Sequence, residues 1–218
     1  MKISLFVLSM VLTGSVQAGI VTYTDKSTFL NAVGSTNATM TYDSNITGDR
    51  DLVSSHTENG VTINNLIAII NNTYGSGIYN VGSGAIAQSG VGETSTVSYT
   101  ENFYAAGFSY FTVQPDGNHA GALTNLTLST GDVFSLDTSG LINGDALFFG
   151  FTSDEALTSF SLATISGSGA DRRWLNTDDV MISTSAVPVP AAVWLFGSGL
   201  IGLVGIRRNI FKLSTLSA

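Results

Sequence analysis

The chain has 218 residues, enough for one ordinary domain with additional segments at its ends. Its formal net charge is −8 at pH 7, and so acidic a chain repels nucleic acid and anionic lipid, which excludes nucleic acid as a partner. The absence of cysteine excludes disulfide bonds and thiolate metal sites.

The first 18 residues have the pattern of a signal peptide. Lys2 supplies a small positive charge, residues 3–12 form an apolar run, and Val16-Gln17-Ala18 provides a cleavage site. A transmembrane anchor is the alternative, but the run has about ten residues, whereas a membrane-spanning helix requires about twenty. We therefore predict cleavage by signal peptidase after Ala18 and export across the inner membrane.

The exported domain is predicted to span residues 19–186. All 16 acidic residues of the chain lie in it, against only Lys26, Arg50, Arg172 and Arg173, so its net charge is −12. Such a surface favours divalent cations or neutral polymers as partners. Gly, Ser, Thr and Asn are abundant and charged residues are scarce, which is typical of secreted β-proteins rather than helical bundles.

A single short helix is predicted near the start of this domain, over residues 25–33. Thr24 or Asp25 is its N-cap, an apolar stripe that includes Phe29 packs it against the sheets, and Gly34 ends it.

The rest of the domain has the pattern of short strands separated by turns such as Thr130-Gly131-Asp132. The predicted strands are residues 61–70, 96–100, 105–113, 123–129, 133–136, 147–151, 158–165 and 180–183. A Gly-rich segment, residues 74–92, is predicted to be an irregular loop with one strand near residues 85–87. Strands that recur every 8 to 15 residues or so predict an all-β fold, an antiparallel β-sandwich of the jelly-roll type.

The domain lacks the sequence patterns of common catalytic sites. His56 and His119 are its only histidines, and no Gly-x-Ser-x-Gly elbow surrounds any serine. Asp154 and Glu155 are adjacent, so on a strand they would point to opposite sides, and they are predicted to form a solvated turn rather than a glycosidase pair. We predict a non-enzymatic protein; a secreted hydrolase that uses another pair of the 16 carboxylates is the alternative.

Trp174 is the only tryptophan of the exported domain, and it follows Arg172 and Arg173 in what is predicted to be a Gly/Ser-rich loop. An exposed aromatic ring beside guanidinium groups can stack on a sugar ring and hydrogen-bond its hydroxyls. These three residues are therefore predicted to bind carbohydrate. The alternative is that Trp174 folds back over the core.

The C-terminal segment, residues 187–210, begins with two prolines one residue apart. Pro188 and Pro190 hold the chain extended and cannot enter a helix interior. Residues 191–206 are almost entirely apolar or glycine and are predicted to be a transmembrane helix, whose flanking residues snorkel to complete the span.

Arg207 and Arg208 follow this apolar run at once. Basic residues stay on the cytoplasmic side of a membrane, so residues 211–218 are predicted to be a short cytoplasmic tail. The order of Pro-x-Pro, apolar helix and arginine pair resembles the PEP-CTERM sorting domain.

This resemblance implies recognition of the tail by a membrane protease-transpeptidase of the exosortase type, in a Gram-negative cell that makes extracellular polysaccharide. The protein would be anchored in the membrane transiently and then reach the cell surface or the medium. Two departures leave the efficiency of processing open: Val189 replaces the usual Glu, and residues 209–218 run past the arginines. A plain C-terminal anchor is the alternative.

Residues 148–153, 157–162 and 178–180 resemble the end of the lectin-like jelly-roll domains common in PEP-CTERM proteins. Those domains show an aromatic-aromatic-glycine strand, a second alternating strand and a closing strand that begins with acidic residues. The resemblance implies a structural Ca²⁺ that ties an early loop to the last strand.

Four carboxylates are the predicted ligands of that ion. Asp43, Asp49 and Asp51 crowd one early loop, and Asp178 begins the last predicted strand. Ca²⁺ takes about six to eight oxygen ligands, which such loops can supply. Ordinary turn chemistry, which also favours Asp and Asn, is the alternative.

These features predict a non-enzymatic protein of the cell surface or extracellular matrix, sorted by an exosortase system and associated with extracellular polysaccharide. A specific carbohydrate-binding module that uses Trp174 and the hydrolase named above are the two alternatives.

Overall fold

The structure, a computed structural model, describes residues 19–43, 48–71, 85–90, 92–114, 116–142, 145–165 and 172–186. This part of the chain contains one helix, α1 (Lys26–Val33), and twelve strands. The strands are β1 (Ile20–Tyr23), β2 (Ala38–Met40), β3 (Arg50–Asp51), β4 (Ser55–Glu58), β5 (Val61–Asn64), β6 (Leu66–Asn71), β7 (Ala85–Ser89), β8 (Thr94–Val113), β9 (Leu123–Leu128), β10 (Val133–Asp137), β11 (Leu147–Ile165) and β12 (Trp174–Ser183).

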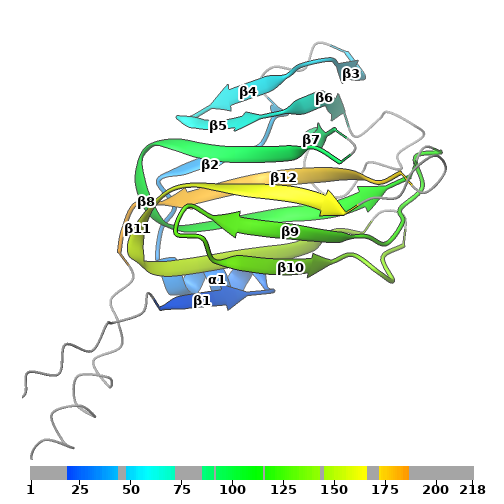
Figure 1. Ribbon diagram of the computed structural model, residues 1–218. Coiled ribbons are helices and arrows are strands. Elements are labelled where there is room, and N and C mark those ends of the chain that lie inside the picture. The colour runs from blue at the N-terminus through cyan, green and yellow to red at the C-terminus, as the bar shows by residue number, and fades with distance from the viewer. Residues whose placement is uncertain are drawn as a thin grey trace, which may run out of the picture.

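The strands form two antiparallel layers, which the long strands β8 and β11 join (Figure 1). Sheet I contains β1, the first half of β11, the second half of β8, β12, β7, β6 and β3, with β2 beside the end of β12. Sheet II contains, in order, β10, β9, the second half of β11, the first half of β8, β5 and β4. The register between β8 and β11 shifts after Thr152 and again before Ser159, where both strands pass from one sheet to the other.

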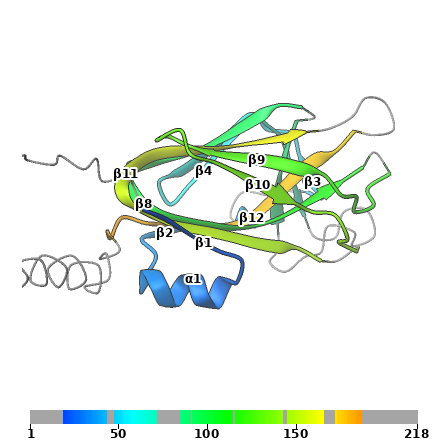
Figure 2. The ribbon, with the colours of Figure 1, turned by 60° about the horizontal axis from the view of Figure 1, so that its bottom comes forward.

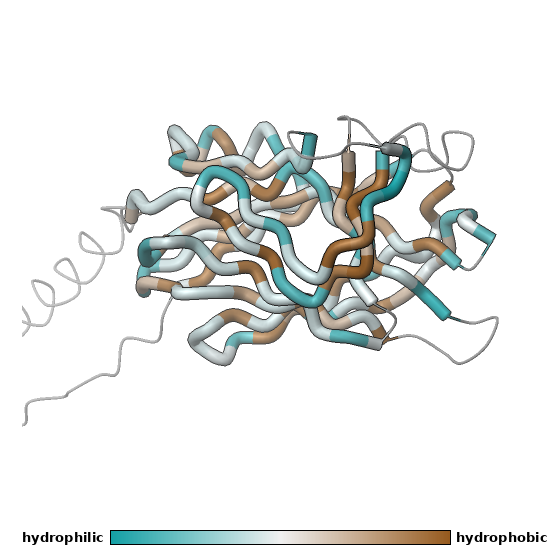
Figure 3. Tube along the Cα trace, turned by 90° about the horizontal axis from the view of Figure 1, so that it is seen from above, coloured by the Kyte–Doolittle hydropathy of each residue, from teal (hydrophilic) through white to brown (hydrophobic). Residues whose placement is uncertain are grey.

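The main core lies between the two sheets. Phe108 of sheet I stacks on Phe160 of sheet II, with ring centroids 5.4 Å apart and an interplanar angle of 11°. Leu126 of sheet II and Leu175 of sheet I are buried in the same cluster. Apolar and polar residues alternate along much of these strands (Figure 3), because alternate side chains face the core and the solvent. The arrangement confirms the predicted antiparallel β-sandwich.

Helix α1 covers the outer face of sheet I beside β1 (Figure 2). Asp25 is its N-cap: Asp25 Oδ1 accepts a hydrogen bond of 2.7 Å from the Thr28 amide. Gly34 ends the helix with a φ of 73°, a conformation that glycine adopts without steric cost. The predicted helix, its cap and its end are confirmed.

Phe29 fixes α1 on the sheet. Its ring is completely buried over Gly107 of β8 and Gly150 of β11, which are direct partners in the ladder. A Cβ atom would lie 2.7 Å from Phe29 Cδ2 if added to Gly150, and 2.9 Å from Phe29 Cε1 if added to Gly107. The Phe29 ring therefore packs directly on the backbone of the two glycines, and a side chain at either position would clash with it.

The segment predicted as one strand over residues 61–70 is two strands in the structure. Asn65 has a φ of 59°, so the chain turns there in a left-handed conformation that a ladder cannot accommodate. As a result β5 pairs in sheet II, whereas β6 pairs in sheet I.

The strands predicted over residues 147–151 and 158–165 are one continuous strand, β11. Asp154 and Glu155, predicted as a turn, lie where this strand bends between the sheets. Two hydrogen bonds hold the bend: the Glu155 amide donates to Ser153 Oγ at 3.0 Å, and Asp154 Oδ1 accepts from the amide of Gly19, at the start of the domain, at 2.7 Å.

Candidate functional site

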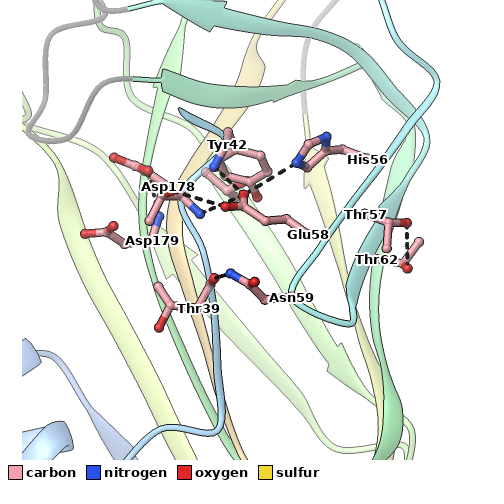
Figure 4. Close-up of polar contacts among 11 residues, drawn as sticks. Thr39, Tyr42, His56, Thr57, Glu58, Asn59, Thr62, Asp178 and Asp179 are labelled. Carbon is pink, nitrogen blue, oxygen red and sulfur yellow. Dashed lines mark hydrogen bonds and ion pairs between the residues drawn. The ribbon is translucent and has the colours of Figure 1, made fainter. Parts of the chain in front are cut away.

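A buried polar cluster lies where the end of β2, strand β4 and strand β12 meet (Figure 4). We call it the polar junction, and it consists of Tyr42, His56, Glu58, Asp178 and Asp179. Tyr42 follows β2, which pairs with the end of β12, and its side chain is completely buried. The Tyr42 hydroxyl lies 3.3 Å from Thr177 Oγ1, so it reaches across to β12.

Glu58 of β4 holds the chain in an unusual turn at Tyr42. Tyr42 has a φ of 63°, which is uncommon for a large side chain and costs free energy. Glu58 Oε2 accepts hydrogen bonds from the backbone amides of Tyr42, at 2.9 Å, and Thr41, at 3.2 Å. Hydrogen bonds to a charged acceptor are stronger than neutral ones, so this carboxylate offsets the cost of the turn.

His56 lies beside that carboxylate. His56 and Glu58 alternate on β4, so both side chains point to the inner face of the strand. The His56 side chain is 7% exposed, and its Nε2 lies 3.6 Å from Glu58 Oε2 without a hydrogen-bond partner. At that distance the pair is an electrostatic contact rather than a hydrogen bond.

Asp178 and Asp179 lie at a β-bulge inside β12, not at the start of the strand as predicted. The register with β8 shifts between Asp178 and Met181, and Asp179 is the left-handed residue of the bulge, with a φ of 50°. Asp178 is buried, and its Oδ1 accepts from the Asp179 amide at 2.7 Å. Asp179 Oδ2 pairs with Lys26 Nζ at 2.7 Å, which ties β12 to α1.

The ionisable groups of the polar junction serve mainly to hold the chain. Burial raises the pKa of the Tyr42 hydroxyl above its ordinary range, and the nearby carboxylates of Asp178 and Glu58 raise it further. The hydrogen bond with Thr177 lowers this pKa but is the weaker effect. The hydroxyl therefore stays protonated at neutral pH. Glu58 is already engaged by two backbone amides. The junction thus fixes the segment before Asp43 against the last strand.

The structure does not bring the four predicted calcium ligands together. Asp178 lies in the bulge, and Asp43 follows directly on Tyr42. Asp49 and Asp51 lie at β3, on the far edge of sheet I, with β6 and β7 between β3 and β12. β3 therefore lies three strand spacings, about 14 Å, from β12. Within the described ranges no group of three or more His, Asp and Glu side chains could hold a metal ion, so calcium stays a prediction.

Trp174 is the first residue of β12, not part of a loop as predicted. Its half-buried side chain packs against a second apolar cluster, on the outer face of sheet I, formed by Ala68, Ile70, Ile86, Phe111 and Val113. Arg173 Nε donates to the Gly121 carbonyl at 3.3 Å, and Arg173 Nη1 donates to the Arg172 carbonyl at 2.9 Å. The three residues predicted to bind carbohydrate therefore lie together at one end of β12, with Trp174 partly over apolar residues and partly open to solvent.

Tyr42, His56 and Glu58 were not predicted as site residues from the sequence. The pattern His56-x-Glu58 before Asn59-Gly60 is a signal for a strand that enters a hairpin with two ionisable side chains on one face. The turn at Tyr42 leaves no such signal, because tyrosine does not favour a positive φ.

The predicted sorting residues Pro188, Pro190, Arg207 and Arg208 lie outside the described residues, as do the predicted signal peptide and transmembrane helix. In the part of the chain that is described, no helix is long and apolar enough to cross a membrane. Residues 186–209 match the PEP-CTERM protein-sorting motif, and all four sorting residues lie within the match. The match confirms the resemblance and implies an exported protein that is processed by an exosortase.

No curated protein matches the sequence. Two solved structures show a distant similarity. One is the CBM22-1 xylan-binding domain of Paenibacillus barcinonensis Xyn10C, with a TM-score of 0.35 and 15% identity over 70% of this chain and 97% of that chain. The other is TmCBM61 in complex with β-1,4-galactotriose, with a TM-score of 0.26 and 13% identity over 58% of this chain and 83% of that chain.

Proposed function

We propose that the protein is a non-enzymatic component of the cell surface or extracellular matrix, delivered by an exosortase system and associated with extracellular polysaccharide. The observation that carries this proposal is the position of the sorting motif. The motif begins at residue 186, and the last strand of the sandwich, β12, ends at Ser183. The folded domain leads into the sorting signal with almost no linker, so the sandwich itself is the delivered cargo.

The polar junction supports a non-enzymatic role. Its one tyrosine is protonated and buried, and Glu58 is bound to backbone amides. These groups stabilise a turn and are not poised for proton transfer. Purified protein should therefore leave a broad panel of polysaccharides and esters unchanged, and turnover of any of them would favour the hydrolase instead.

The intact mass of the protein, recovered separately from the cell surface and the medium, tests the sorting. Processing predicts a mass that lacks residues 1–18 and the residues beyond the Pro-x-Pro site, and any excess mass would report an attached glycan or lipid. A variant with Arg207→Ala and Arg208→Ala is the matched control and should keep residues 191–218. A wild-type mass that still includes residues 191–218 would mean a plain membrane anchor.

Association with polysaccharide is tested by co-sedimentation with the polymer extracted from the source cells. The expected result is that the protein sediments with the polymer and stays in solution after the polymer has been degraded. Protein that fails to sediment with any extracted polymer would contradict the proposed association.

Specific carbohydrate binding through Trp174 is the second candidate function. The observation in its favour is that the Trp174 side chain is not fully buried and directly follows Arg172 and Arg173 in the chain. Trp174→Ala should then abolish retention on the extracted polysaccharide, whereas Trp174→Phe should keep part of it. Unchanged retention by Trp174→Ala would exclude this candidate.

A structural calcium ion is proposed for the same domain. Its support is the placement of Asp43 and Asp178 at and beside the polar junction, together with the resemblance to lectin-like jelly rolls. Addition of Ca²⁺ to metal-free protein should raise the melting temperature of the wild type more than that of Asp178→Asn. Equal melting temperatures with and without Ca²⁺ would contradict the proposal.

A further inference from the structure

The solvent face of sheet II carries an uncharged array of hydroxyl and amide side chains. Alternate residues of its strands point away from the main core and stand opposite one another in the ladder registers. The first row is Thr57, Thr62, Ser98 and Ser159, the second is Ser55, Asn64, Thr96, Ser161, Thr127 and Val133, and the third is Thr94, Ala163, Asn125 and Ser135. We call these three rows the hydroxyl face. Every member is exposed or half-buried.

The hydroxyl face contains no charged and no aromatic residue, although the domain has 16 acidic residues. Charged residues make up 11% of the chain, and none of them lies in these three rows, so the area across the six strands is neutral. Just beyond the third row, Leu123 and Ile165 stand opposite each other and are 45% and 59% exposed. Asp137, the partner of Leu123 on β10, is the carboxylate beside this pair. The hydroxyl face is thus a neutral polar area with two exposed apolar side chains, Leu123 and Ile165, along one edge.

The chemistry of this face matches that of an uncharged sugar polymer. Serine and threonine hydroxyls donate and accept hydrogen bonds, as do asparagine amides, and sugar hydroxyls do both in turn. The apolar C–H faces of sugar rings can contact the exposed Leu123 and Ile165. Anionic polymers are disfavoured, because the domain around the face carries a net charge of −12.

The regular spacing of the face favours a long polymer over a short one. Neighbouring strands lie about 4.8 Å apart and alternate residues about 6.7 Å apart, so the hydroxyls form a repeating grid. Each exposed hydrogen bond competes with water and contributes only about 0.5–1.5 kcal/mol. A chain that occupies many positions at once gains by multivalency, whereas a single sugar does not.

We infer that the hydroxyl face binds an uncharged polysaccharide chain in extended contact with several strands. The inference rests on the proposed association with extracellular polysaccharide and deepens it by naming the surface and the class of polymer. A second copy of the chain fits this face poorly, because its rows hold only two apolar residues, Ala163 and, on the edge strand β10, Val133, whereas protein interfaces have an apolar centre.

The test uses the full chain and two probes, the neutral and the anionic polysaccharide extracted from the source cells and separated by anion exchange. Ser98→Lys with Thr127→Lys places two long side chains across the face. Thr22→Lys with Asn31→Lys adds the same charge at exposed positions of β1 and α1 and is the matched control. Ser98→Ala with Thr127→Ala removes hydroxyls without adding bulk, in case the lysine variant does not fold.

Affinity electrophoresis should show that the wild type and the control bind the neutral polymer and that the lysine variant binds at least tenfold more weakly. The alanine variant should lose about tenfold, and short fragments of the neutral polymer should bind the wild type at least tenfold more weakly than the intact polymer. If the lysine and alanine variants bind the neutral polymer as tightly as the wild type does, the inference is wrong but the proposed function stands. Wild type that binds only the anionic polymer also overturns the inference.

Wild type that binds neither polymer overturns both the inference and the proposed association. Static light scattering tests the remaining possibility, that a second copy of the chain covers this face. A wild-type dimer that the lysine variant dissociates would identify the face as a contact between copies, and the inference would then be wrong.

Discussion

A methyl group added at Gly150 should displace the ring of Phe29 and loosen α1 from sheet I. The new Cβ would lie 2.7 Å from Phe29 Cδ2 and 2.9 Å from Phe29 Cγ, and the ring is completely buried, so it cannot swing into solvent without losing its contact with the sheet. Overpacking of a well-packed site typically costs about 1–3 kcal/mol. We expect Gly150→Ala to lower the free energy of unfolding by about 2 kcal/mol.

A double variant isolates the cause of this effect. Phe29→Ala alone removes a fully buried ring and should cost about 3–5 kcal/mol. Once the ring is gone, Phe148 Cε1 at 3.1 Å is the remaining close atom, and it belongs to a half-buried ring that can shift into the vacated space. The methyl group of Gly150→Ala should then cost less than about 0.5 kcal/mol. The sum of the two single-variant losses in free energy of unfolding should therefore exceed the loss in the double variant by roughly 1.5 kcal/mol.

Urea unfolding followed by circular dichroism measures all four proteins of this cycle. Gly48→Ala is the matched control, because the nearest atom to an added Cβ there is Asp51 Oδ1 at 4.0 Å. The control should change the free energy of unfolding by less than about 0.5 kcal/mol. Additive effects of Gly150→Ala and Phe29→Ala would refute the explanation that the glycine makes room for the ring.

Two further predictions concern single carboxylates. Glu58→Ala should lower the free energy of unfolding by about 2–3 kcal/mol, because two backbone amides lose their charged acceptor, whereas the exposed Glu101→Ala should change it by less than about 0.5 kcal/mol; equal effects in urea would contradict this role. Hydrogen bonds from Ser27 and Thr28 lower the pKa of Asp25 from 3.8 to about 2, so the stability that this carboxylate adds is complete above pH 3.8 and is lost as the pH falls through 2. Asp25→Asn should therefore flatten the fall of the melting temperature between pH 4 and pH 2, and an unchanged slope would count against the cap.

The elements that depend on local sequence could be predicted. Helix α1 is specified by Asp25 before it and Gly34 after it, both of which act within one turn. The strand over residues 158–165 alternates so regularly that its inner and outer faces follow from the sequence. The sorting motif is equally local, since it lies within residues 186–209.

The division of strands between the sheets could not be predicted, because tertiary packing decides it. Asn65 breaks one β-branched run into two strands, although asparagine at that position only permits a left-handed turn and does not require one. Conversely, Asp154 and Glu155 have the composition of a turn but lie in the continuous strand β11. This strand bends together with its neighbour β8, with which it stays paired on both sides of the bend.

The polar junction was beyond sequence reasoning for the same reason. Glu58 binds an amide 16 residues earlier in the chain, and Tyr42 reaches a hydroxyl 135 residues away. Alternation shows that His56 and Glu58 share a face of β4, but not which loop that face will meet. For the same reason the sequence could not show that Asp49 and Asp51 lie at β3, on the far edge of sheet I from Asp178.

The strand registers place the two ends of the exported domain on the same side of the sandwich. Val21 of β1 stands opposite Thr152, Thr152 opposite Ala105, and Ala105 opposite Ser183 of β12, so the domain begins and ends at one end of the sandwich, about 14 Å apart. The ten residues of β12 span about 30 Å from there back to Trp174. A copy held through its C-terminal end would therefore carry Trp174 at the end of β12 that lies farthest from the point of attachment.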